Sequence, residues 1–83
     1  MNPYTDNSNI RIFSEDVDPM SLIWHKDQED RTIEVIEGNG WKFQFDEEIP
    51  FELTENLNFD IPRGYLHRVI KGNENLTIKI IKK

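Results

Sequence analysis

The sequence predicts an all-β protein built as a sandwich or a barrel. Apolar and β-branched residues recur at every second position in short runs, which is the pattern of strands with one buried face. Turn-forming Gly, Pro, Asn and Asp separate these runs roughly every eight to twelve residues, a spacing typical of sandwiches and barrels. Because many short strands present many unpaired edges, closure or double layering is expected to protect them.

The expected strands form a single domain over residues 9–83, after a flexible N-terminal lead-in over residues 1–8. They cover residues 9–13, 20–24, 31–36, 41–45, 51–53, 57–61, 65–70 and 76–81. Turn-forming residues predict the turns between these strands. "EGNG" supplies glycines for positive φ, and "KGNEN" combines glycine with asparagine. "DEEIP" and "DIPRG" place proline at strand edges. No helix can be placed with the same consistency.

The size of the chain limits its core. A domain of 83 residues buries only about 60% of its unfolded surface, and the absence of cysteine excludes both disulfides and a thiolate metal site. We therefore expect a homodimer, with residues 9–13 pairing with the partner subunit. The sequence starts without a basic region followed by an apolar run and contains no segment of about 20 apolar residues, so a cytoplasmic location is expected and no membrane partner.

The charge balance argues against nucleic acid as a partner. The chain has 16 Asp and Glu against 10 Lys and Arg, a net charge of −6, which disfavours capture of a phosphate backbone. The basic C-terminal "KIIKK" is interpreted as the solvated end of an edge strand, where lysines discourage pairing between sheets.

Strand alternation places two polar side chains among apolar ones. Arg31 shares a face with Ile33 and Val35, and His67 lies on an apolar side of its strand. A buried guanidinium must be paired or must reach a water-filled pocket, because an unpaired buried charge is too costly. The carboxylate of Asp27 is the nearby candidate partner.

The stretch that begins at His25 resembles the first motif of the cupin family, commonly written G(X)5HXH(X)3-4E(X)6G. His25 stands at the first histidine, Asp27 at the second, Arg31 at the glutamate and Gly38 at the closing glycine. The spacing fits the motif, whereas the residue types at the second and third of these positions depart from it.

A second stretch, "PRGYLH", resembles the other cupin motif, G(X)5PXGXXH(X)3N. Pro62, Gly64 and His67 match it, while Asn56 stands at the first glycine and Lys71 at the final asparagine. The resemblance covers roughly residues 20–82. It implies a cupin-type double-stranded β-helix, or jelly-roll barrel, whose interior usually holds a divalent metal.

By position, the resemblance implies that His25, Asp27, Arg31 and His67 occupy the four ligand places. Arg31 cannot bind a cation. The remaining two histidines and one carboxylate are a set able to hold iron, manganese, nickel or zinc with open coordination positions. Three alternatives stay open: a metal bound by this triad, a metal-free pocket in which Arg31 pairs with Asp27, or an anion-binding pocket built from Arg31 and the histidines.

Two aromatic residues, Trp41 and Tyr65, join Arg31 as candidates for contact with a small ligand, although a tryptophan more often packs in a core. No serine-based triad, calcium-binding loop or phosphate-binding loop is recognisable. Two functions therefore remain: a cupin-fold protein that binds a small ligand or assembles with a partner without established catalysis, and a metal-dependent cupin enzyme, an oxygenase or isomerase, acting on a small, anionic substrate.

Overall fold

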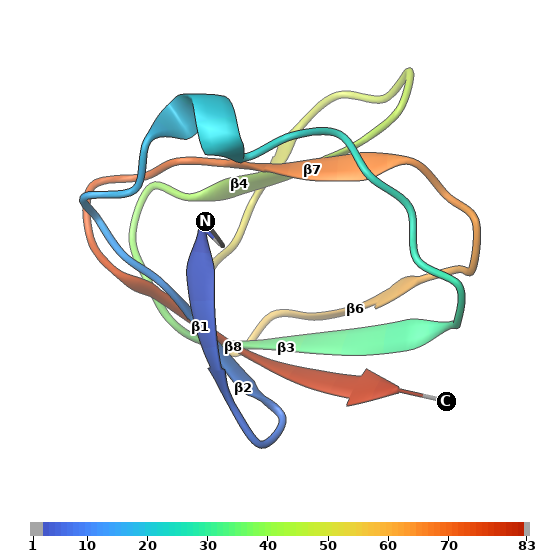
Figure 1. Cartoon of the computed structure of the whole chain (residues 1–83), viewed down its shortest axis with the longest axis horizontal. Coiled ribbons are helices and arrows are strands. Elements are labelled where there is room, and N and C mark those ends of the chain that lie inside the picture. The colour runs from blue at the N-terminus through green and yellow to red at the C-terminus, as the bar shows by residue number, and fades with distance from the viewer. Residues whose placement is uncertain (1–2, 83) are drawn as a thin grey trace.

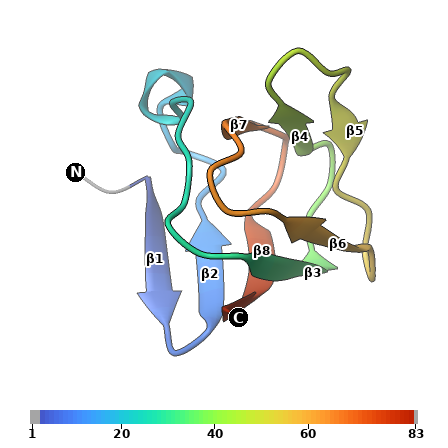
Figure 2. The same ribbon diagram turned by 90° about the vertical axis from the view of Figure 1, so that its right-hand side faces the viewer.

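The computed structural model describes residues 3–82 and confirms an all-β architecture of two antiparallel sheets. The five-stranded sheet has the order β1 (Tyr4–Asn7), β2 (Ile10–Phe13), β8 (Leu76–Lys82), β3 (Arg31–Glu37) and β6 (Asn58–Ile61). The three-stranded sheet has the order β5 (Phe51–Glu52), β4 (Lys42–Phe45) and β7 (His67–Ile70). The two sheets lie on opposite sides of the molecule and face one another across its interior (Figures 1 and 2).

The core lies between the two sheets and follows the expected alternation. In β3, Ile33 and Val35 are buried while their neighbours in sequence are more exposed, and in β8 Leu76, Ile78 and Ile80 are buried. Registers bring these residues together, since Ile33 lies opposite Ile80 on one side and Phe59 on the other. Phe43 of the three-stranded sheet completes the core from the opposite side.

Residues 20–24, predicted as a strand, do not form one. The chain instead makes a 3-10 helix, η1 (Pro19–Ser21), followed by irregular backbone. The carboxylate of Asp18 accepts a hydrogen bond from the N–H of Met20 at 2.9 Å, and Pro19 lies at the start of the helix. Asp at an N-cap and Pro in the first turn favour a helix start, and this local chemistry outweighs the weak strand pattern.

The N-terminal residues, predicted as a flexible lead-in, include a strand. β1 pairs with β2 through a tight turn in which Ser8 has a positive φ of 60°. Tyr4 packs on Phe13 with 5.4 Å between ring centroids, and Arg11 forms two hydrogen bonds with Asp6, at 2.8 and 3.1 Å. Cross-strand contacts of this kind stabilise a β-hairpin.

Strand order corrects two further expectations. β2 lies between β1 and β8, so both of its edges are hydrogen-bonded within the chain and neither is open to a partner subunit. β8, expected at an edge because of its lysines, lies between β2 and β3. The outer strands of this sheet are β1 and β6.

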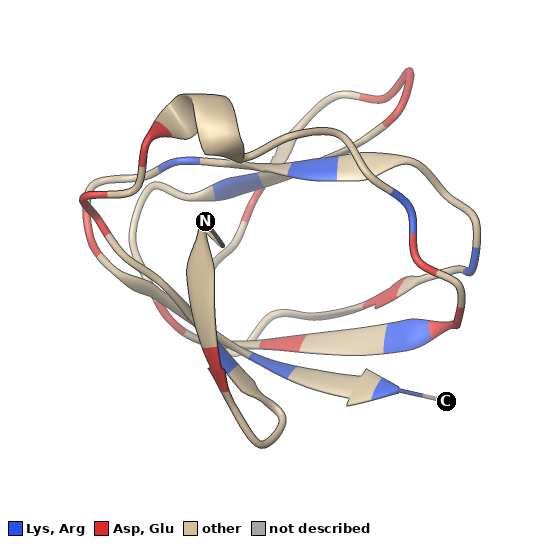
Figure 3. Cartoon of the chain, in the orientation of Figure 1, with Lys and Arg blue, Asp and Glu red and all other residues tan. Residues whose placement is uncertain are grey.

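The charged residues occur around the whole barrel, and acidic ones mark the connection between β4 and β5 (Figure 3). Within residues 3–82, no helix is long and apolar enough to cross a membrane. The glycines of "EGNG" have positive φ, with values of 151° at Gly38 and 81° at Gly40, as the turn chemistry predicts.

Candidate metal and ligand site

Backbone pairing brings the two histidines together. The segment between η1 and β3 runs along β7 before it crosses to the other sheet (Figure 1). His25 and His67 exchange both of their backbone hydrogen bonds, each at 2.9 Å, and their rings lie 4.3 Å apart. A residue pair that exchanges both bonds is fixed in register, so the two side chains are held next to one another by the main chain.

Each histidine is also oriented through its ring. Nδ1 of His25 lies 3.1 Å from the carbonyl oxygen of Ile23, and Nδ1 of His67 lies 2.8 Å from that of Tyr65. A carbonyl only accepts hydrogen bonds, so these contacts assign the proton to Nδ1 and leave the Nε2 lone pair of each neutral ring free. Histidines that bind metals are commonly held in this way.

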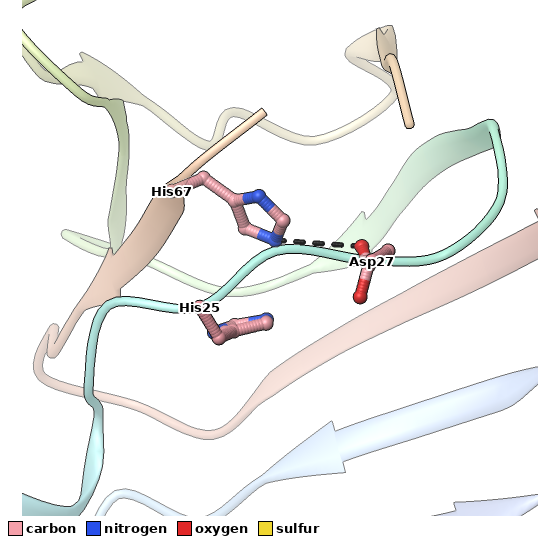
Figure 4. Close-up of side chains that lie close together, drawn as sticks. All are labelled: His25, Asp27 and His67. Carbon is pink, nitrogen blue, oxygen red and sulfur yellow. Dashed lines mark ion pairs between the residues drawn. The ribbon is translucent and has the colours of Figure 1, made fainter. Parts of the chain in front are cut away.

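Asp27 supplies the third side chain of the cluster, which is shown in Figure 4. One carboxylate oxygen, Oδ2, lies 3.5 Å from Nε2 of His67, and the ligand atoms of His25, Asp27 and His67 all lie within 4.8 Å of one another. The backbone of Asp27 is anchored because its carbonyl accepts a hydrogen bond from the N–H of Gly64 at 3.0 Å. Oδ2 is buried and has no hydrogen-bond partner, an arrangement that calls for an explanation in a folded protein.

Arg31 contacts two carboxylates instead of one. Its Nη1 lies 3.5 Å from Oδ1 of Asp27, and its Nη2 donates a hydrogen bond to Oε1 of Glu29 at 3.2 Å. The guanidinium is therefore shared between Asp27 and Glu29 and is not paired with Asp27 alone. Lys82 also approaches Glu29, at 3.6 Å. The Nε of Arg31 is buried and has no hydrogen-bond partner.

Glu29 is the residue of this site that sequence reasoning missed. It lies in the polar stretch "DQED" and stands two residues from both Asp27 and Arg31. That spacing is the signal that could have revealed it, because in an extended segment residues two apart point to the same side.

The environment of His67 favours the neutral ring. Only 2% of the residue is exposed, and the ring stacks on Phe43 with 5.2 Å between centroids. Burial is the main cause that lowers the pKa of His67 below its usual value, and the nearby His25 and Arg31 act in the same direction, against the Tyr65 carbonyl and Asp27. A lowered pKa keeps the imidazole neutral near pH 7, which is the form that binds metals.

The cluster borders a cavity of about 350 Å³. His25, Asp27, Arg31 and His67 all line it, and the rest of its wall is largely apolar, including Ile33, Phe43, Leu53, Phe59, Ile61 and Val69. A concave apolar space with a few convergent polar groups is the usual form of a small-molecule site.

The two aromatic candidates for ligand contact do not lie with this cluster. Trp41 is fully buried in the core, packs on Phe13 and donates its indole N–H to the carbonyl of Glu74. Tyr65 lies in the turn before β7 with 55% of its surface exposed, because the strand begins only at His67. Neither residue is part of the cavity wall.

Comparison with known proteins defines the fold class. A crystal structure of protein NMB1881 from Neisseria meningitidis superposes with a TM-score of 0.60 and 13% identity, over 99% of this chain and 81% of that one. A cupin-2 domain containing protein from Shewanella frigidimarina superposes with a TM-score of 0.58 and 18% identity, over 95% of this chain and 76% of the other. No family model and no curated protein matches the chain.

These likenesses, together with the two facing sheets, identify a cupin-type jelly-roll fold and confirm the predicted fold class. The likeness concerns the fold, because both solved structures are less than 25% identical to this chain. Its His25, Asp27 and His67 form a group that could hold a metal ion.

Proposed function

We propose that this chain is a small-molecule-binding protein that holds a divalent metal ion through His25, Asp27 and His67. The observation that carries the proposal is the buried Oδ2 of Asp27, which has no hydrogen-bond partner and lies beside two imidazoles whose Nε2 atoms are free. A cation at this point would satisfy all three groups. Two neutral imidazoles and one carboxylate suit iron, manganese, nickel or zinc and leave coordination positions open.

The geometry of Arg31 supports metal binding over a pocket closed by an ion pair. The 3.5 Å separation between Arg31 and Asp27 is longer than the 2.7–3.2 Å of ordinary N–H···O hydrogen bonds. Arg31 has a better partner in Glu29, at 3.2 Å. Asp27 can therefore turn to a metal ion while the guanidinium keeps a carboxylate partner.

The chain's own residues would divide the remaining tasks. His25 and Asp27 approach from the segment before β3, His67 approaches from β7, and the carbonyls of Ile23 and Tyr65 hold the two rings. The apolar wall of the cavity would exclude water and receive the body of a ligand. The metal, when bound, supplies a Lewis acid that polarises a ligand oxygen.

A metal-dependent oxygenase or isomerase is the second candidate. It is favoured by one observation, that a three-ligand set with open positions borders a cavity large enough for a small substrate. Binding and catalysis share the same first requirement, which is the metal.

The test is a metal titration. Elemental analysis of protein purified without an affinity tag is combined with calorimetric titration of chelator-treated protein with manganese and zinc. We expect binding near one ion per chain, and at least about tenfold weaker binding in Asp27→Asn and His67→Ala. Asp46→Asn, at an exposed position in the turn that follows β4, is the matched control and should bind like the parent. Equal, weak binding in all four proteins would refute the metal site and leave the pocket closed by the Arg31–Asp27 pair.

We also propose a homodimer, as expected for a chain with so small a core. Because β2 is enclosed, β1 is the strand that supports this proposal, as an outer strand of the five-stranded sheet. Pairing between β1 strands would extend that sheet across two subunits.

A further inference from the structure

We infer that the ligand of the cavity is a small monocarboxylate with an apolar body, and that Arg31 is the residue that selects its carboxylate. The inference rests on the proposed function in one respect, since a bound metal ion would offset the negative charge of Asp27. It otherwise follows from the hydrogen-bonding capacity of Arg31 and the lining of the cavity.

Arg31 lines the cavity and carries a buried donor that has no hydrogen-bond partner. Its Nη atoms are directed to Asp27 and Glu29, but its Nε is buried without a partner, and the residue lines the cavity wall. A buried N–H of a charged group that makes no hydrogen bond is costly. A carboxylate oxygen suits this donor, because a hydrogen bond between a guanidinium N–H and a carboxylate is charge-assisted.

A second arginine at the same cavity shows the contrast. Arg11 also lines the wall, but its Nε and Nη2 both donate to the carboxylate of Asp6, and its guanidinium carbon lies 3.7 Å from the centroid of the Tyr4 ring. Arg11 is therefore already committed to partners within its own hairpin. Of the two guanidinium groups at the cavity, Arg31 is the one with an unused buried donor.

The rest of the cavity defines the other end of the ligand. Phe43, Phe59, Ile33 and Ile61 present apolar surface, so an extra hydroxyl or a second carboxylate would be buried without partners there. The volume of about 350 Å³ lies near the lower end of the range found for ligand pockets. A short aliphatic or aromatic acid fits both limits.

Charge predicts that the metal and the carboxylate bind cooperatively. In the metal-free protein, an anion at Arg31 would lie near the carboxylate of Asp27 and be repelled by it. A divalent ion on Asp27 reverses the sign of that interaction. By thermodynamic reciprocity, the metal should strengthen carboxylate binding by the same factor by which the carboxylate strengthens metal binding.

The experiment compares hexanoate, its neutral amide hexanamide, and the dicarboxylate adipate by calorimetry on manganese-loaded protein. We expect hexanoate to bind at least about tenfold more tightly than either comparison ligand, in line with one charge-assisted hydrogen bond. Arg31→Gln should bind manganese but lose the preference for hexanoate over hexanamide. Arg31→Lys, which keeps the charge and loses the fork, should retain only part of it. Arg63→Gln, at an exposed position outside the cavity wall, is the matched control and should keep the preference.

The outcomes separate the two proposals. A preference for hexanoate that survives in Arg31→Gln, or no preference in the parent, overturns the assignment of Arg31 even if manganese binds. Failure of manganese to bind overturns the proposed function instead, and the same three titrations on the metal-free protein then decide whether Arg31 alone selects the carboxylate. Equal affinity for hexanoate with and without bound manganese overturns the cooperativity.

Discussion

Replacing Arg31 by glutamate should remove the positive charge that offsets the nearby carboxylates. The stability of the folded protein should then depend strongly on a bound metal ion. The side chain of Arg31 is only 15% exposed and lies within 3.5 Å of one carboxylate and 3.2 Å of another. Arg31→Glu therefore replaces two attractions with repulsion among three carboxylates. A pair of like charges about 4 Å apart costs about 4 kcal/mol at an effective dielectric constant near 20.

Protonation limits this cost. A glutamate with an ordinary pKa near 4.3 takes up a proton at pH 7 for about 3.7 kcal/mol, since each pH unit corresponds to about 1.36 kcal/mol. The free energy of unfolding of the metal-free variant should therefore fall by about 2–4 kcal/mol. For a domain of this size that corresponds to a melting temperature lower by about 10–30 °C.

Metal should reverse the effect, because the new carboxylate stands at the position where the cupin motif has its glutamate. The assay is thermal unfolding followed by circular dichroism, in chelator and in excess manganese, for the parent, Arg31→Glu and the neutral control Arg31→Gln. Manganese should raise the melting temperature of Arg31→Glu by more than that of the parent, as ligand binding to the folded state requires. A variant that melts like the parent in chelator, or that gains no more from manganese, would refute the reasoning.

Three further outcomes are expected. In chelator, the lowered pKa of His67 means that the unfolded chain binds a proton that the folded chain lacks. The free energy of unfolding should therefore fall as the pH drops below about 6.5, by at most about 1.4 kcal/mol per pH unit. Denaturant titration measures this pH dependence, and His67→Gln should remove the part that is due to His67. Gly72→Ala should destabilise the fold by about 3 kcal/mol or more in the same titration, because the new Cβ would meet the backbone N of Trp41. Gly64 has open space around it and a φ of +82°, so Gly64→Ala should cost only about 1–2 kcal/mol. Sedimentation at tens of micromolar should give the mass of a dimer, and a monomeric mass would contradict the proposed assembly.

Strand alternation carried much of the fold prediction. The burial of Ile33, Val35 and His67 follows from the side-chain period of two, which holds wherever one face of a sheet meets a core. The prediction failed at residues 20–24, where capping by Asp18 and the position of Pro19 decide the local structure. The prediction also failed at Tyr65, because the expected strand began two residues too early: β7 begins only at His67.

The site was harder to predict, because its polar contacts depend on the path of a segment that is not a regular strand. The resemblance to the two cupin motifs brought His25, Asp27 and His67 into one hypothesis, and the structure brings their ligand atoms together. Spacing could not show that the main chain of His25 pairs with that of His67, nor that the N–H of Gly64 anchors the carbonyl of Asp27. Both contacts join segments far apart in the sequence.

Glu29 explains how Arg31 can stand next to Asp27 in the proposed metal site. If Asp27 were the only partner of Arg31, metal binding would leave a guanidinium that is largely buried without a counter-charge, a situation that costs several kcal/mol. Glu29 supplies a second carboxylate to the same guanidinium, and Lys82 of β8 lies close to Glu29. Acidic and basic side chains therefore alternate along these contacts, in the order Asp27, Arg31, Glu29 and Lys82. The cluster can then lose Asp27 to a cation without leaving a buried charge unpaired. Glu29 is in this sense a positioning residue, and Glu29→Gln should weaken metal binding by strengthening the hold of Arg31 on Asp27.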